Sequence, residues 1–259
     1  MQNAKTKFIA LLFTAYIIAT FGLLIWAIQH SPSRAINTST TFGPAPDFSA
    51  ITDIAERKAA FFNYFTPIIE HKNTLILADR ERLAAVQSDW QQNATLSNTH
   101  QLYLSRWLKR YKIKEEWPIE KQLAELDKRM HIIPPALVLA QAANESAWGT
   151  SRFAQDGNNY FGQWCFKKGC GLVPSGRRAN AKHEVRKFKS PAGSVDAYLR
   201  NLNTHRAYKQ LRNIRAQLHQ ADQPITGVAL AEGLIKYSER GEEYVHELQA
   251  MMRSNGLEE

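Results

Sequence analysis

The sequence is poor in cysteine and lacks the motifs of nucleotide- and nucleic-acid-binding proteins. Only two cysteines occur among the 259 residues, and no zinc-finger spacing of cysteines and histidines is present. No P-loop and no RNA-binding motif is present. The net charge of +9 indicates a basic surface, which suits a polyanion or an anionic envelope. We therefore expect no nucleic-acid partner, no metal and no organic cofactor.

The two cysteines lie close together, in WCFKKGC. Four intervening residues can close a small loop, and a disulfide is the natural state of such a pair in an exported compartment. Zinc is a poor alternative because no second pair of ligands lies nearby. We predict a disulfide between Cys165 and Cys170, which stabilises the fold by about 2 kcal/mol.

Charge is absent from one long segment near the N-terminus. Residues 8–28 contain no charged residue, and at a rise of about 1.5 Å per residue they span about 30 Å, enough for a bilayer core. Lys5 and Lys7 precede this segment, which predicts a cytoplasmic N-terminus. We expect residues 1–29 to be an inner-membrane anchor, with the rest of the chain exported to the periplasmic side of the cell envelope. Secretion after cleavage of a signal peptide is the alternative, although its apolar region is usually about 7–15 residues.

The next part of the chain changes from a linker to helices. Residues 30–50 are rich in Ser, Thr and Pro, which is typical of a linker. Apolar residues at helical spacing over residues 51–115 predict a helical support region, in which Pro67 should interrupt the first helix. A further helix is expected over residues 119–130. Residues 116–259 are then expected to form the functional domain.

The last part of the chain predicts a small β-lobe followed by helices. Residues 169–189 hold Gly, Pro and the alternating segment HEVRKF, which indicates a β-element with few residues in strands. Helices should start at Ser190-Pro191 and Thr226-Gly227, and another should cover EEYVHELQAMM. The fold class is therefore α+β and mostly helical. Six cations in the β-element form either a solvated strand face or a contact to anionic polymer: Arg177, Arg178, Lys182, Arg186, Lys187 and Lys189.

One carboxylate stands out, in the run PPALVLAQAANESAWGTSRF. Residues 136–143 are almost wholly apolar, which predicts a buried helix that begins at Pro134-Pro135 and is capped by Gly149. Glu145 then falls in its last turn, where burial and the negative end of the helix dipole both raise the pKa of the carboxyl group. A carboxylic acid that stays protonated near neutral pH suits general acid catalysis. The alternative is a Glu that points to water.

An aromatic loop follows, NNYFGQW. Together with Trp148, its residues Tyr160, Phe161 and Trp164 offer flat faces that can stack on sugar rings, which suits a loop that lines a cleft. The alternative is that these are ordinary core aromatics.

AQAANESAWGTSRFA followed by NNYFGQW resembles the signature of the peptidoglycan-cleaving N-acetylglucosaminidase family, and the stretch from WCFKKGCGLVP to KYSERGEEYV resembles the bacterial Bax-type proteins that carry this domain. The resemblance implies a lysozyme-like fold, peptidoglycan glycan strands as the partner, and Glu145 as the acid. It also implies that Tyr237 lies in the cleft near the acid. The family's YNLFG-like motif reads NNYFG here, so both Asn159 and Tyr160 are candidates for its polar position. Tyr244 can be read as a packing residue.

The second catalytic group is harder to place. Glu184, in the expected β-lobe, is the best candidate for a base or nucleophile, with a salt bridge to Arg186 or Lys182 as the alternative. Asp156 and Asp196 are weaker candidates. An N-acetyl group of the substrate can also replace a second carboxylate.

Three functions are compatible with these residues. The first is an endo-acting N-acetylglucosaminidase on peptidoglycan, which the NNYFGQW loop favours. The second is a lytic transglycosylase, which also uses one Glu. The third is a non-catalytic peptidoglycan-binding scaffold. No feature of the sequence identifies a protein partner.

Overall fold

The computed structural model describes residues 40–177 and 181–257. Residues 41–259 form one compact unit, which is considered by itself. The membrane span expected over residues 8–28 lies outside the described residues. Within the described ranges, no helix combines the length and the apolar character needed to cross a membrane.

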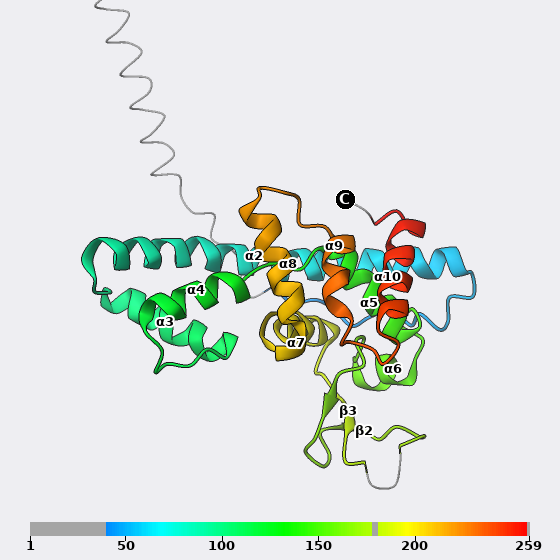
Figure 1. The fold of residues 1–259 in the computed structure, drawn as a ribbon. Helices are drawn as coiled ribbons and strands as arrows, with labels where there is room; N and C mark the ends of the chain where they lie inside the picture. The colour runs from blue at the N-terminus through cyan, green and yellow to red at the C-terminus, as the bar shows by residue number, and fades with distance from the viewer. Residues whose placement is uncertain (1–39, 178–180, 258–259) are drawn as a thin grey trace, which may run out of the picture. The chain divides into compact units, whose positions relative to one another are not determined.

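The unit is mostly helical and carries a small sheet between α6 and α7 (Figure 1). Its helices and strands in chain order are α2 (Ile54–Asn93), α3 (Asn98–Tyr111), α4 (Ile119–Arg129), α5 (Pro135–Ser146), α6 (Arg152–Gly157), β1 (Trp164–Cys165), β2 (Gly171–Leu172), β3 (Glu184–Arg186), α7 (Pro191–Thr204), the 3-10 helix η1 (Arg206–Tyr208), α8 (Lys209–Gln220), α9 (Gly227–Ala231), the 3-10 helix η2 (Glu232–Leu234) and α10 (Glu242–Ser254).

Helix α5 lies at the centre of the unit. Every residue from 136 to 143 is buried, and the helix packs against α2, α9 and α10 (Figure 1). Because this segment is apolar on all sides, burial against three helices is the arrangement that removes most of its surface from water. The prediction of a buried helix is confirmed. Its expected C-cap, Gly149, is wrong, because the helix ends at Ser146 and its C-cap is Ala147.

Helix α2 continues through Pro67, so the expected interruption is wrong. A proline inside a helix removes one backbone hydrogen bond and costs about 3 kcal/mol or more. Burial of large apolar side chains, at about 1.5–3 kcal/mol each, outweighs that cost. Four such side chains beside the proline have no exposed surface: Phe61, Phe65, Ile68 and Ile69.

The described end of the predicted linker is packed onto α2. Phe48 is 1% exposed, and its ring centroid lies 5.3 Å from that of Phe61. The hydroxyl of Tyr64 donates to the carbonyl of Gly43 at 2.7 Å. Phe48 also covers Gly149, where an added Cβ would lie 2.3 Å from the ring. Residues 41–50 therefore belong to the packed unit.

The β-lobe is a three-stranded antiparallel sheet with β3 between β1 and β2. Trp164 pairs with Val185, and Gly171 pairs with Arg186. The small β-element predicted over residues 169–189 is confirmed, although β1 precedes it. Cys165 and Cys170 form a disulfide that links β1 to the turn before β2, as predicted. In Figure 1 this lobe lies below the helices.

Both predicted helix starts in the last part are confirmed. The hydroxyl of Ser190 accepts from the amide of Gly193 at 3.3 Å, and that of Thr226 accepts from the amide of Ala229 at 3.2 Å. Helix α10 is also as expected. Helix α8 was not predicted, because its sequence KQLRNIRAQLHQ is largely polar and two of its buried residues are arginines.

Candidate active site

Glu145 lies in the last turn of α5, directly before a sharp change of chain direction. Ala147, Trp148 and Gly149 all have positive φ, at 50°, 58° and 78°. The hydroxyl of Ser146 stabilises this turn, because it accepts from the amide of Gly149 at 2.8 Å and donates to the carbonyl of Ala142 at 2.6 Å. A left-handed conformation costs a non-glycine residue about 1–2 kcal/mol, so the fold holds local strain next to the candidate acid.

A chain of hydrogen bonds leads from the core to the Glu145 carboxyl group. The hydroxyl of Tyr244, on α10, donates to Oε1 of Glu145 at 2.7 Å. Nε2 of Gln141 donates to the same hydroxyl at 2.9 Å, and the hydroxyl of Tyr198 donates to Oε1 of Gln141. Because Tyr244 accepts from Gln141, its single proton is directed at Glu145.

The pKa of Glu145 is raised above its ordinary value, and burial is the main cause. The hydrogen bond from Tyr244 and the positive charge of Arg240 act in the opposite direction, because both favour the carboxylate. Glu247, which forms an ion pair with Arg240, adds to the increase. This electrostatic balance leaves a carboxyl group that retains its proton to higher pH than an exposed Glu.

Tyr237 lies beside this group without bonding to it. Its ring stacks on that of Tyr244, with centroids 5.6 Å apart and planes 2° from parallel. Its hydroxyl donates to the carbonyl of Phe161 at 2.9 Å, which ties η2 and the following turn to the NNYFG loop. Burial raises the pKa of Tyr237 well above its usual value, so the hydroxyl stays protonated.

The NNYFG loop is built around the buried side chain of Asn159. Nδ2 of this residue donates to the carbonyls of Gln163 and Arg186, and Oδ1 accepts from the amides of Phe161 and Gln163. All four polar contacts of the side chain are thus internal to the protein. An amide that satisfies backbone groups in this way shapes the loop and offers little to a substrate.

Two of the four aromatic residues expected to line a cleft are core residues in this structure. Tyr160 and Phe161 are each 2% exposed, because Tyr160 packs on Phe65 at 4.6 Å and Phe161 stacks on Tyr198 at 4.1 Å. The expectation that their faces contact sugar is therefore not met. Their large apolar area is buried against α2 and α7 instead.

The other two aromatic residues are more accessible. Trp148 is half-buried and lies beneath Nζ of Lys58, 4.9 Å from its ring centroid. Trp164 is 58% exposed and stacks on His183 at 4.0 Å. Gly162, in the loop, lies next to the acid, because an added Cβ would lie 3.4 Å from Oε2 of Glu145.

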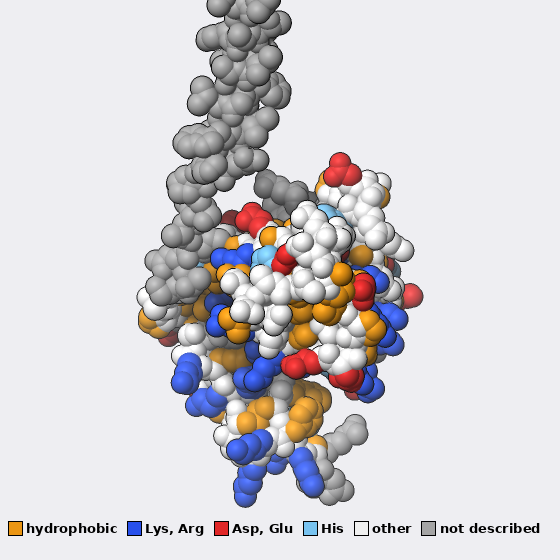
Figure 2. Space-filling view, turned by 90° about the vertical axis from the view of Figure 1, so that its left-hand side faces the viewer, with side chains coloured by type: hydrophobic (Ala, Val, Ile, Leu, Met, Phe, Trp, Pro, Cys, Tyr) orange, Lys and Arg blue, Asp and Glu red, His pale blue; other side chains and the backbone are white. Residues whose placement is uncertain are grey.

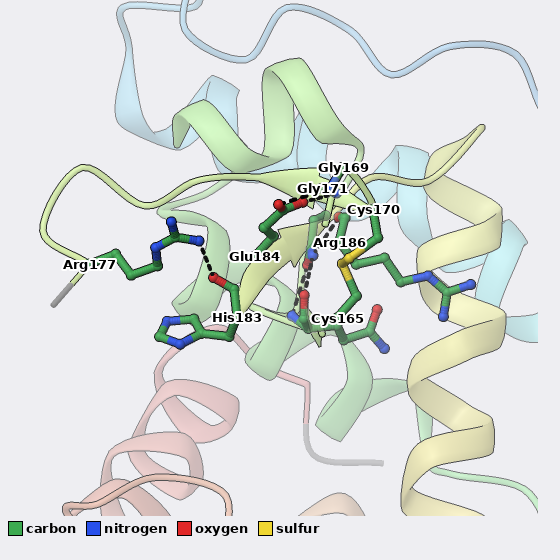
Figure 3. The surroundings of a disulfide bond; sticks show 10 residues. Cys165, Gly169, Cys170, Gly171, Arg177, His183, Glu184 and Arg186 are labelled. Carbon is green, nitrogen blue, oxygen red and sulfur yellow. Dashed lines mark hydrogen bonds between the residues drawn. A yellow bond between two sulfur atoms is a disulfide. The ribbon is translucent and has the colours of Figure 1, made fainter. Parts of the chain in front are cut away.

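The carboxylate of Glu184 is hydrogen-bonded to backbone amides within the β-lobe (Figure 3). The residue is 5% exposed, and its carboxylate accepts from the amides of Gly169 and Gly171 at 2.9 and 2.8 Å. These two hydrogen bonds lower the pKa of Glu184. In the described part of the chain it forms no ion pair with Arg186 or Lys182, which removes the expected salt bridge. The carboxylate fixes the disulfide-bonded turn.

The sequence did not indicate Tyr244, Gln141 and Arg240 as parts of the site. The sequence could have indicated Gln141, because it is the one polar residue in the apolar run PALVLAQAA. A polar side chain that is fully buried needs partners, and these turn out to be the two tyrosine hydroxyls. Asp196, a weak candidate for the second carboxylate, pairs with Arg110 at 3.0 Å.

Comparison with known proteins defines the class. Residues 120–257 match the family described as mannosyl-glycoprotein endo-beta-N-acetylglucosaminidase. This match covers more than half of the chain, so the chain belongs to the glucosaminidase family and carries a glycosidase domain that acts on glycans. Helices α2 and α3 lie outside the match but within the same compact unit.

The comparison with individual proteins agrees with this family. The chain is 38% identical over 214 residues to Protein bax of Escherichia coli (strain K12), across 81% of this chain and 74% of that protein. The resemblance to Bax-type proteins is thus confirmed. A solved structure of a type VI secretion system effector-immunity complex from Pseudomonas protegens is 19% identical, with a TM-score of 0.30, and the similarity covers 58% of this chain and 89% of that one.

Proposed function

We propose that this protein is an endo-acting β-N-acetylglucosaminidase that cleaves the β-1,4 bond after N-acetylglucosamine in peptidoglycan, with Glu145 as the general acid. One observation carries the proposal: in a chain of a glycosidase family, a half-buried carboxyl group with a raised pKa ends the central helix and accepts a directed hydrogen bond from Tyr244. A protonated carboxyl group of this kind is the donor that glycosidic bond cleavage needs.

The surroundings of Glu145 suit both states of a general acid. Before the reaction, burial keeps the proton on the carboxyl group. When the proton passes to the leaving glycosidic oxygen, a carboxylate forms, and Tyr244 and Arg240 stabilise its negative charge. The acid is therefore protonated at rest and stabilised when it ionises.

The second group is proposed to come from the substrate. Glu184 has both carboxylate oxygens engaged by backbone amides, which argues against a role as nucleophile. The acetamido carbonyl oxygen of N-acetylglucosamine can attack its own anomeric carbon as the glycosidic bond breaks, and water then opens the ring that forms. The hydroxyl of Tyr237 donates to Phe161 but keeps a lone pair, so it can accept from the acetamide N–H and orient it.

We further propose that the chain is anchored in the inner membrane by residues 8–28 and that the described unit acts in the periplasm. The disulfide supports an oxidising compartment, and peptidoglycan lies on that side of the inner membrane. Fractionation of intact cells followed by protease treatment of spheroplasts tests this topology. Protection of the described unit inside spheroplasts would contradict it.

Mass spectrometry of digested peptidoglycan tests the activity. The proposal predicts fragments that end in reducing N-acetylglucosamine. Fragments that end in anhydro-N-acetylmuramic acid would instead identify a lytic transglycosylase, and absence of fragments would indicate a scaffold. Glu145→Gln should lower the rate about 10²–10⁴-fold, since it removes the proton donor and keeps the shape. Glu243→Gln, an exposed Glu on α10, is the matched control and should keep full activity.

A second pair of variants tests the substrate-assisted mechanism. Glu184→Gln should keep substantial activity, whereas Tyr237→Phe should lose more. If Glu184→Gln is as inactive as Glu145→Gln and added azide yields a glycosyl azide, a conventional carboxylate pair is the better account.

A further inference from the structure

A cavity of about 720 Å³ lies between α3, the β-lobe and α7, and its walls are strongly basic. Six of its lining residues are cations from these three parts of the chain: Arg106, Lys109, Arg110, Lys112, Arg186 and Arg200. None of the lining residues is acidic. Arg186 reaches from β3 towards α7 (Figure 3), and Lys and Arg side chains gather at the height of the β-lobe in Figure 2.

These charges are poorly compensated by the protein itself. Arg110 is paired with Asp196 at 3.0 Å. The other five cations have no carboxylate within 4.0 Å in the parts of the chain that the structure describes. Like charges that line one cavity repel each other and create a positive potential, which attracts an anion. The cavity thus has the charge of an anion-binding site rather than that of an ordinary solvated helix face.

A short segment of the chain connects the wall of the cavity to the candidate acid. Gln163 and Trp164 line it, and both follow directly after Gly162, the residue that faces Oε2 of Glu145. The exposed ring of Trp164 is therefore part of the pocket wall, two residues after the glycine that faces the acid. A polymer bound at Glu145 that extends along this segment would reach the pocket.

We propose that this pocket binds the carboxylates of the peptide branches of peptidoglycan while the glycan strand lies at Glu145, an inference that rests on the proposed function. The N-acetylglucosamine units of the strand are uncharged, whereas the peptide branches carry free carboxylates. Arginine binds a carboxylate through two parallel hydrogen bonds, and three of the five unpaired cations are arginines. A pocket of this volume suits a compact branch, which argues against the continuous backbone of a long polyanion.

Titration calorimetry with a soluble peptide branch, released from peptidoglycan by an amidase, tests the pocket without requiring cleavage. The purified full-length protein should bind the peptide, and higher salt should weaken the binding. Lys109→Gln/Arg200→Gln should bind about tenfold more weakly, since each lost contact involves two charged groups. Lys209→Gln/Arg253→Gln removes the same charge and the same residue types from exposed positions outside the pocket, and should bind like the wild type.

Three results would overturn the proposal: no binding by the wild type, equal binding by the two double variants, or equal binding of a peptide whose carboxyl groups are amidated. Digestion of intact peptidoglycan gives a second readout. The pocket variant should raise KM and leave kcat nearly unchanged, and it should not alter cleavage of an uncharged N-acetylglucosamine oligomer. Peptide binding by a protein that digests no glycan would refute the proposed activity alone, whereas digestion without peptide binding would refute the pocket alone.

Discussion

Replacement of Tyr244 by Phe should move the pH dependence of the reaction in a direction that the structure fixes. A general acid must be protonated, so activity is lost as the pH rises through the pKa of Glu145. The hydroxyl of Tyr244 donates to Oε1 of Glu145 and so favours the ionised form. Without that donor the pKa of Glu145 rises, and the alkaline limb of the rate profile moves to higher pH.

The size of the effect follows from the kind of hydrogen bond that is lost. A hydrogen bond to a charged group contributes about 1.5–3 kcal/mol. Since 1.36 kcal/mol corresponds to a tenfold change in a protonation equilibrium, the alkaline limb should move by about one to two pH units. The plateau rate should fall as well, because the carboxylate formed during proton transfer loses a stabilising donor. Nε2 of Gln141 also loses its acceptor, which lowers the free energy of unfolding by about 1–3 kcal/mol.

The assay is kcat/KM on soluble glycan fragments over a range of pH, with the fold monitored by circular dichroism at each point. Tyr64→Phe is the matched control. It removes one hydrogen bond of similar length, from the Tyr64 hydroxyl to the carbonyl of Gly43, and this bond has no contact with Glu145. The control should leave the limb in place. An unmoved limb in Tyr244→Phe, or a limb displaced to lower pH, would refute the assignment of Glu145 as the acid that Tyr244 adjusts.

Three further predictions concern stability. Burial raises the pKa of Glu145 above its unfolded value of about 4.3, so the wild type loses stability as the pH rises from there through the folded pKa. Glu145→Gln should therefore melt at a higher temperature than the wild type above that range, with no difference at pH below about 4; a constant difference at all pH values would contradict this. Gly162→Ala places a side chain at φ 61° and 3.4 Å from Oε2 of Glu145. It should therefore lower the melting temperature by about 2–4 °C and reduce kcat. An unchanged melting temperature and kcat would contradict the importance of glycine beside the acid. Cys165→Ser/Cys170→Ser should lower the free energy of unfolding in urea by about 2 kcal/mol, and the wild type under reducing conditions should match it.

The sequence predicted those features that depend on local patterns. The apolar run at residues 136–143 indicated a buried helix. Ser190 and Thr226 each cap a helix, because their hydroxyls accept from the amide three residues later. Two cysteines separated by four residues can close a loop locally. Pro67 was misjudged because its local cost is offset by packing that lies elsewhere in the sequence.

The hydrogen-bond partners of the candidate site were not predictable in this way. Tyr244 and Glu145 are 99 positions apart, so their contact depends on how α10 packs against α5. Glu184 is the converse case, a residue that the sequence suggested for the site and whose contacts the sequence did not predict. Its position in the β-lobe suggested catalysis, but its carboxylate accepts from two backbone amides of a turn whose conformation the sequence does not specify.

The network also indicates which oxygen of Glu145 carries the proton. Because Gln141 donates to Tyr244, the hydroxyl of Tyr244 must donate onward, and Oε1 of Glu145 is occupied as its acceptor. The proton therefore belongs on Oε2, the oxygen that faces Gly162. A Cβ at that position would lie in van der Waals contact with Oε2. The same glycine begins the segment that continues through Gln163 to Trp164 and the basic pocket. Proton delivery from Oε2 by the proposed acid would place the scissile bond next to Gly162, where the segment that continues to the proposed branch-binding pocket begins.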